Sequence, residues 1–114
     1  MYNTIFGKII NKEIPADIVY EDDFVLAFND IAPQAPIHII IIPKKEIPTI
    51  NDIAPADSEI VAKMVLTAQK IAKDKAIDQS GYRIVMNCNE HGQQTVFHLH
   101  IHLLGGRQMN WPPG

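Results

Sequence analysis

Near the carboxyl end of this 114-residue chain, histidines alternate with apolar residues over Phe97-His98-Leu99-His100-Ile101-His102-Leu103-Leu104. A period of two is typical of a β-strand, because a strand sends successive side chains to opposite faces. The pattern therefore predicts a strand with the three histidines on one face and the intervening apolar residues buried on the other. Three adjacent imidazoles stabilise no core, since buried polar groups need partners. We expect this face to hold a ligand, a metal or a reaction.

The first thirty residues predict a short helix and a hairpin. Thr4 can cap a helix that ends before Pro15. Its apolar face consists of Ile5, Phe6, Ile9 and Ile10. Two β-rich runs, Ile18–Tyr20 and Phe24–Phe28, flank an acidic turn and predict the hairpin.

A proline-containing loop and a buried strand follow. Pro33 and Pro36 stiffen the loop and exclude it from a central strand. The run Ile37–Ile42 then predicts a strand buried on both faces, interrupted only by His38.

The second half of the chain predicts one long helix and two more strands. The helix is expected over about residues 55–77, and its apolar stripe consists of Ile60, Val61, Met64, Val65, Ala68, Ile71 and Ala72. Residues 82–88 predict a strand, and the polar loop 89–95 makes it an antiparallel neighbour of the histidine strand. The predicted fold class is α+β: one domain, 1–114, with a mostly antiparallel sheet of about five strands, one long helix and one short helix.

Composition excludes several classes of function. The net charge is −3, and no run of Lys and Arg is long enough to follow a phosphate backbone, so we expect no nucleic-acid partner. Cys88 is the only cysteine, which excludes an internal disulfide and a Cys-rich zinc site. The longest apolar stretch, Ile39–Ile42, is far shorter than a membrane span, and we expect neither a membrane partner nor a signal peptide. The expected location is the cytoplasm.

Histidines two residues apart on a strand suit either metal ligation or phosphoryl transfer. The outer two of the three would lie about 13 Å apart at the backbone. Zinc–nitrogen bonds are about 2.0–2.1 Å long, so three histidines on one straight strand make an awkward chelate. Phosphoryl transfer fits better, because an imidazole with a pKa near 6.5 is mostly neutral at pH 7 and keeps one nucleophilic lone pair. The loop before the strand carries donors suited to phosphate, among them Asn87, Gln93 and Thr95.

The chain resembles the histidine triad superfamily, whose pattern is His-φ-His-φ-His-φ-φ with φ apolar. The run from His98 to Leu104 matches that pattern. Other segments resemble the nucleotide-binding branch of the superfamily, which hydrolyses purine nucleoside phosphoramidates. They are Thr4-Ile5-Phe6-Gly7-Lys8-Ile9-Ile10, Glu13-Ile14-Pro15-Ala16, Ala27-Phe28-Asn29-Asp30-Ile31-Ala32-Pro33-Gln34-Ala35-Pro36, His38, Ile42-Pro43-Lys44, Gly105-Gly106-Arg107-Gln108-Met109 and Trp111-Pro112-Pro113-Gly114.

The resemblance implies a role for each candidate residue. His100 would be the nucleophile that forms a covalent nucleotidyl intermediate, and His102 would hold the α-phosphate oxygens. His98 and His38 would orient the nucleophile, and Asp30 would accept hydrogen bonds from the ribose hydroxyls. Phe6, Ile9, Phe28 and Ile31 would form an apolar slot for the base, while Asn87, Gln93 and Thr95 would lie near the phosphate and the leaving group.

The resemblance also implies a homodimer whose sheets join edge to edge. The tail 105–114 would contribute to that dimer and bring Trp111 near the partner's site. A purine nucleotide is the expected substrate, with no cofactor and no metal. The chain departs from the branch at Gln93, where the usual motif Gly-Gln-Ser or Gly-Gln-Thr has glycine. If the backbone at that position has a positive φ, Gln93 is strained.

Other interpretations remain open at this point. The enzyme could instead hydrolyse dinucleoside polyphosphates, or the chain could be a nucleotide-binding or zinc-binding interaction protein without catalysis. Individual residues also have structural explanations: Phe6 and Ile9 as core, Asp30 as a turn aspartate, His38 as a buried polar residue with a partner, Thr95 as a β-former and Cys88 as packing.

Overall fold

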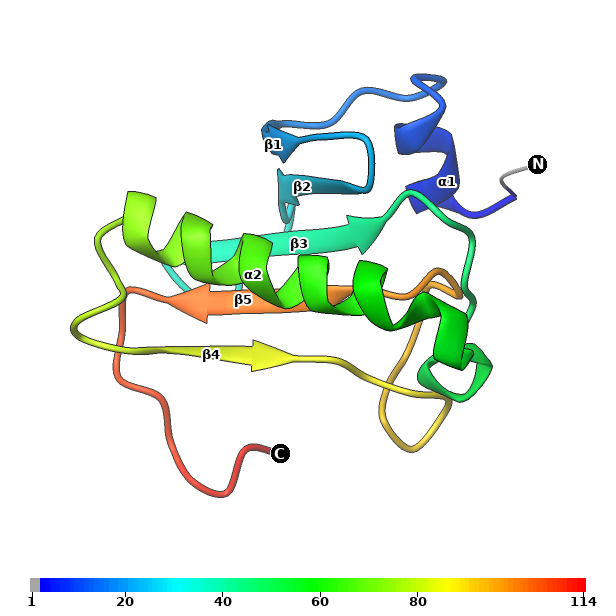
Figure 1. Ribbon diagram of the computed structural model, residues 1–114. Helices are drawn as coiled ribbons and strands as arrows, with labels where there is room; N and C mark the ends of the chain where they lie inside the picture. Colours follow the sequence, from blue (N-terminus) through cyan, green and yellow to red (C-terminus); the bar gives the residue numbers. More distant parts are fainter. Residues whose placement is uncertain (1–2) are drawn as a thin grey trace.

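A computed structural model describes residues 3–114 of the chain. Five antiparallel strands form one sheet in the order β1-β2-β3-β5-β4, and helix α2 lies across one of its faces (Figure 1). The elements are α1 (Ile5–Ile10), β1 (Ile18–Glu21), β2 (Val25–Asn29), β3 (Ile37–Pro43), 3-10 turns at Ile50–Asp52 and Pro55–Asp57, α2 (Ser58–Asp74), β4 (Tyr82–Val85) and β5 (Ile101–Gly105). The predicted fold class, with one long helix and one short one, is confirmed.

The larger core lies between the sheet and α2. Alternate residues of β2, β3 and β5 meet the helix there, because a strand sends every second side chain to the same face. The members of this core include Val25, Ala27, Ile39, Ile41, Met64, Ala68, Ile71, Ala72, Leu99, Ile101 and Leu103. The predicted stripe of α2 is wrong at Val65, which is 44% exposed, whereas Thr67 is buried.

A smaller core on the opposite face holds α1. Phe6 and Ile9 of this helix pack against the remaining side chains of β2 and β3, namely Leu26, Phe28, Ile40 and Ile42. Thr4 begins the helix as predicted, since its hydroxyl accepts a hydrogen bond from the Gly7 amide at 3.0 Å. His38, Ile40 and His102 share this face, because Ile40 pairs directly with His102 in the sheet. The predicted histidine face is therefore the face that α1 covers in part.

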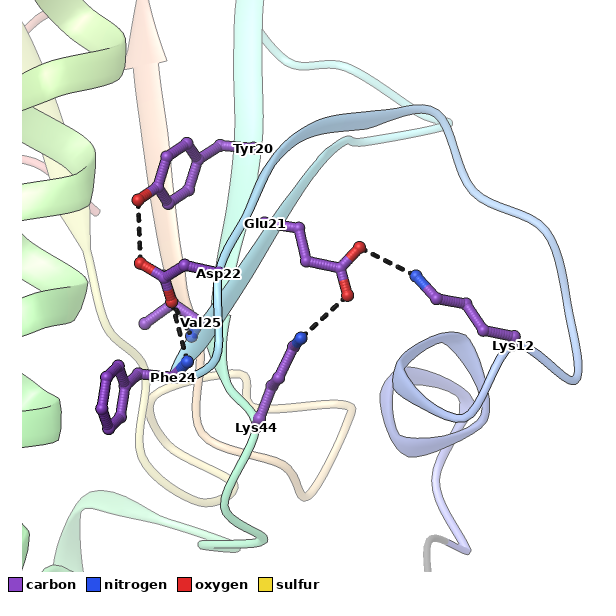
Figure 2. A network of polar contacts seen from close by, with 7 residues as sticks. All are labelled: Lys12, Tyr20, Glu21, Asp22, Phe24, Val25 and Lys44. Atoms are coloured by element: carbon purple, nitrogen blue, oxygen red, sulfur yellow. Dashed lines mark hydrogen bonds and ion pairs between the residues drawn. The ribbon is translucent and has the colours of Figure 1, made fainter.

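A three-residue ion-pair network ties the segment after α1 to the sheet. Figure 2 shows the Glu21 carboxylate between two amino groups, with Lys12 Nζ at 2.9 Å and Lys44 Nζ at 2.8 Å. Lys12 follows α1, Glu21 ends β1 and Lys44 follows β3. Each exposed pair contributes little stability alone. Together they connect three segments around the short helix.

Two predicted strands are shorter in the structure. The histidine strand was expected over 97–104, but β5 begins only at Ile101. The register pairs Ile41 with Ile101, so Leu99 would face Pro43, which has no amide hydrogen to donate. The Leu99 amide instead donates to the carbonyl of Ile47 at 2.7 Å. His98 and His100 therefore lie just before the strand rather than in it. The strand expected over 82–88 ends at Val85, where its partner β5 begins.

The long helix is also shorter than the 55–77 expected. Residues 55–57 form a 3-10 turn, and α2 ends at Asp74. Ala76 has a φ of +57°, a left-handed conformation that stops the helix. Ile77 then turns inward and is buried in the larger core. Within residues 3–114, none of the helices has the length and apolar character needed to cross a membrane.

Candidate active site

A cavity of about 330 Å³ opens between α1 and the sheet face that carries the histidines. Its apolar wall comes largely from α1, from the segment after it and from β2 and β3. Its polar lining includes Asp30, Thr95, His100 and His102. The remaining lining residues are Ile5, Phe6, Ile9, Ile14, Pro15, Ala16, Asp17, Phe28, Asn29, Ile31, Ile40 and Val96. The cavity therefore combines one apolar wall with two imidazoles and two carboxylates, those of Asp17 and Asp30.

The ring of His100 is fixed by the chain just before it. Its Nδ1 lies 2.7 Å from the carbonyl oxygen of His98, and the residue is only 6% exposed. A carbonyl oxygen can only accept a hydrogen bond, so Nδ1 carries the proton. In the neutral ring, Nε2 then keeps its lone pair. The Phe6 ring packs edge-on against this imidazole, with 4.9 Å between the ring centres.

His98 lies behind His100 and is fully buried. Its Nε2 donates to the carbonyl oxygen of Pro43 at 2.8 Å, at the end of β3. His98 thus connects the end of one central strand to the start of the next. Because its own carbonyl holds His100, its position sets where the His100 ring lies.

A single backbone amide indicates which ring nitrogens of His38 and His102 carry the proton. The amide of Gln34 donates to His38 Nδ1 at 3.0 Å, so this nitrogen is an acceptor and the His38 proton is on Nε2. His38 Nε2 lies 2.9 Å from His102 Nδ1 and 3.4 Å from an oxygen of Asp30. It therefore donates to His102 Nδ1, which leaves the His102 proton on Nε2. The two cavity histidines consequently differ: His100 offers a lone pair at Nε2 and His102 offers an N–H.

Burial keeps all four of these histidines neutral. Desolvation lowers the pKa of His38, His98 and His100 below the ordinary value. The pKa of His102 falls furthest, to about 4, because burial is reinforced by its neighbours His100 and His38. The Asp30 carboxylate opposes part of this decrease. A neutral His100 is what a nucleophile at pH 7 requires.

The site geometry suits zinc poorly. The facing atoms of Asp30, His38 and His102 lie within 4.8 Å of one another. However, the two nitrogens of this group are 2.9 Å apart and already hydrogen-bonded. Two nitrogens on a tetrahedral zinc are about 3.3 Å apart, given bonds of about 2.0–2.1 Å. A metal there would have to break the contact that orients His102.

The structure brings most of the predicted site residues together. His100, His102, Asp30, Ile31, Phe6, Ile9, Phe28 and Thr95 line the cavity, and His38 and His98 contact its histidines. Asn87, Gln93 and Trp111 lie outside the lining within residues 3–114 of this one chain. Sequence reasoning missed the cavity contacts of the segment Ile14–Asp17, although its proline could have indicated an ordered turn beside the helix.

The possibility of a positive φ at Gln93, in the loop before the histidines, is confirmed. Gln93 has a φ of +62°, a region that favours glycine. Its amide donates to the Glu90 carbonyl at 2.9 Å, and the Gln94 amide donates to the Asn89 carbonyl at 3.0 Å. Both amides are therefore used inside the turn.

Comparison with known proteins gives consistent matches. A family profile described as "Scavenger mRNA decapping enzyme C-term binding" matches residues 3–111. The chain is 55% identical over 106 residues to the purine nucleoside phosphoramidase of Escherichia coli K12, covering 93% of this chain and 89% of that protein. It is 51% identical over 115 residues to the "14 kDa zinc-binding protein" of Brassica juncea, covering 98% of this chain and all of that protein.

Solved structures agree with this relationship. The crystal structure of a HIT family hydrolase from Legionella pneumophila superimposes with a TM-score of 0.97 at 54% identity, covering 98% of this chain and all of that one. A histidine triad protein from Clostridium difficile gives 0.93 at 46% identity, covering 96% of each chain. These matches cover almost the whole chain. Their identities are high enough to assign the chain, with its histidine-lined cavity, to a known family. The chain belongs to the histidine triad (HIT) family.

Proposed function

We propose that this protein is a hydrolase that cleaves the P–N bond of purine nucleoside 5′-phosphoramidates. One observation carries the proposal: the His98 carbonyl holds the proton of His100 on Nδ1, which leaves Nε2 as a lone pair at the cavity. The 55% identity to a purine nucleoside phosphoramidase supports the substrate class.

The reaction proceeds in two displacements at phosphorus. His100 Nε2 attacks the phosphorus, a new N–P bond forms, and the P–N bond to the amine breaks as the amine takes up one proton from solvent, which the second step returns. The nucleotidyl imidazolium keeps its Nδ1 proton on the His98 carbonyl, which stabilises the positive charge. Water then attacks the same phosphorus, loses a proton, and releases the nucleoside monophosphate and neutral His100.

His102 stabilises the charge that develops on the phosphoryl oxygens. Its Nδ1 accepts from His38, so its Nε2 proton is the available donor. A neutral donor held in advance on a partly buried ring needs no reorganisation when the charge develops. Thr95, also at the cavity, supplies a hydroxyl for the same oxygens.

The apolar wall accommodates a purine. Phe6 and Phe28 pack edge to face, with ring centres 5.5 Å apart, and Ile9 lies beside them in the lining. Ile31, also in the lining, is 99% exposed and would offer a further apolar contact to the base. Asp30, also in the lining, would accept hydrogen bonds from the ribose hydroxyls.

We also propose that the protein is a cytoplasmic homodimer. Strand β4 forms an edge of the sheet, and its Tyr82 and Ile84 are 38% and 42% exposed. An open edge with apolar side chains suits strand pairing with a second copy. The tail would then carry Trp111, which is 82% exposed in one chain, toward the partner's cavity. Asn87 and Gln93 would act near the leaving group.

A steady-state assay on adenosine and guanosine 5′-phosphoramidates with different amines tests the proposed activity. We expect turnover in the presence of a chelator, and loss of at least about a thousandfold in kcat for His100→Ala, the nucleophile. His91→Ala, which removes an exposed histidine in the preceding loop, is the matched control and should keep full activity. A His100→Ala protein with full activity contradicts the proposal. Faster turnover of dinucleoside polyphosphates would favour the other triad chemistry.

A further inference from the structure

The start of the C-terminal tail contacts the proline loop between β2 and β3. After β5 the chain turns at Gly106, which has a φ of +87° and lies against Pro36: a Cβ there would be 2.9 Å from the Pro36 side chain. This turn directs Arg107 back to the loop. Arg107 Nε and Nη2 both donate to the carbonyl oxygen of Gln34, at 3.2 and 3.1 Å. The guanidinium thus holds one loop carbonyl with two hydrogen bonds.

The residue held by Arg107 is the one that controls His38. The Gln34 amide donates to His38 Nδ1 at 3.0 Å, while the carbonyl of the same residue faces Arg107. The Gln34 side chain donates to the Ala32 carbonyl at 3.0 Å and so contributes to the same turn. The hydrogen bonds from Arg107 restrict rotation of the backbone at residue 34, on which the direction of the Gln34 amide hydrogen depends.

We infer that Arg107 is a positioning residue for the cavity histidines, acting through the Gln34 carbonyl and amide on His38 and through His38 on His102. This inference rests on the proposed function for its kinetic consequence, but not for its structural one. Arg107 itself is exposed and lies outside the cavity lining. Its effect is to keep the His38 proton on Nε2 and the His102 proton on Nε2.

Loss of Arg107 should change which nitrogen of His38 is protonated and should leave the fold intact. Arg107 is on the surface, so truncation removes no buried side chain. The freed loop lets the Gln34 amide turn away, and His38 Nδ1 can then take up the proton. Because the Asp30 carboxylate lies 3.4 Å from His38 Nε2 and still favours a proton there, the result is a mixture of the two forms. Each time it moves to Nδ1, His102 loses its donor and the phosphoryl oxygens lose a correctly oriented N–H. We expect kcat to fall about tenfold while KM changes less than twofold, since purine and ribose contacts remain.

The experiment measures the ring nitrogens directly by long-range ¹H–¹⁵N spectroscopy of the imidazoles in ligand-free protein at pH 7.5. Arg107→Ala should shift His38 from one protonated nitrogen to a mixture. Arg83→Ala is the matched control, because Arg83 also donates to a tail carbonyl, that of Asn110 at 2.8 Å, without touching the loop. It should leave the spectra of His38 and His102 unchanged. An Arg107→Ala spectrum identical to wild type overturns the inference, whatever the activity.

A second pair of variants keeps the test decisive if Arg107→Ala does not fold. Gln34→Pro removes the amide hydrogen itself, whereas Gln34→Ala keeps it and removes only the side chain. We expect the Pro variant to give the mixed His38 pattern and the Ala variant to retain the wild-type pattern. Equal spectra for the two overturn the inference. Because the spectra need no turnover, they separate this result from failure of the proposed activity, which His100→Ala tests.

Discussion

The buried histidines predict that the protein loses stability in mild acid, and His102 should contribute the largest single share. Its pKa is about 4 in the folded protein and about 6.5 in an unfolded chain. Between these values the unfolded state binds more protons than the folded state. Stability is therefore complete above about pH 6.5 and decreases as the pH falls toward 4.

The size of the effect follows from the two pKa values. A difference of about 2.5 pH units corresponds to about 3.4 kcal/mol once the pH is below both. At pH 5 linkage gives about 2 kcal/mol of that total. His102 is partly exposed, and solvent screening reduces its contribution to about 1 kcal/mol. His38, His98 and His100 act in the same direction, because burial lowers the pKa of each.

Urea unfolding at pH 7.5 and pH 5 measures this contribution. His102→Gln removes the titrating ring, so its free energy of unfolding should fall between the two pH values by about 1 kcal/mol less than that of wild type. His91→Gln is the control, because it removes an exposed imidazole. Its free energy of unfolding should fall between the two pH values as much as that of wild type. A wild-type protein as stable at pH 5 as at pH 7.5 would refute the reasoning.

Three other substitutions test separate parts of the site. Asp30→Asn should raise KM for a phosphoramidate about tenfold with little change in kcat, because a charged acceptor becomes neutral; an unchanged KM counts against ribose binding. Gly92→Ala places a Cβ 2.7 Å from the Cys88 carbonyl oxygen and should lower the free energy of unfolding by about 1–3 kcal/mol, whereas Gly114→Ala, with open space around it, should not. Gln94→Leu leaves buried loop groups without their partner and should destabilise by about 1–3 kcal/mol in the same urea assay.

Local sequence patterns predicted the helices and strands well where the buried side chains recur with the period of a helix or a strand. The hairpin of β1 and β2, the capped helix α1 and the buried strand β3 all lie where their patterns indicated. In β5 the alternation placed Ile101 and Leu103 in the larger core, as expected. Side-chain period thus identified the faces of the sheet correctly.

The ends of the elements could not be predicted, because they depend on partners distant in the sequence. β5 begins late since its partner there would be Pro43, and β4 ends where β5 begins. The helix ends at Asp74 because Ala76 adopts a positive φ and lets Ile77 reach the core. None of these features can be recognised from the local alternation of apolar and polar residues.

The different roles of the histidines also could not be predicted from the local sequence pattern. Alternation suggested three equivalent rings, yet each ring has a different partner: Pro43 for His98, the His98 carbonyl for His100 and His38 for His102. Only the resemblance to a family assigned them different tasks. The hydrogen bond from Gln34 to His38, which decides the protonated nitrogens, requires the folded loop.

The central claim is that His100 Nε2 becomes covalently attached to the nucleotide. Rapid quench of the enzyme with an adenosine 5′-phosphoramidate, followed by peptide mass spectrometry under conditions that preserve the acid-labile N–P bond, measures this directly. We predict an adenylated peptide whose modification maps to His100, formed and lost at rates that account for kcat. Modification at another histidine, or full turnover with no adenylated peptide at any time point, would contradict the account.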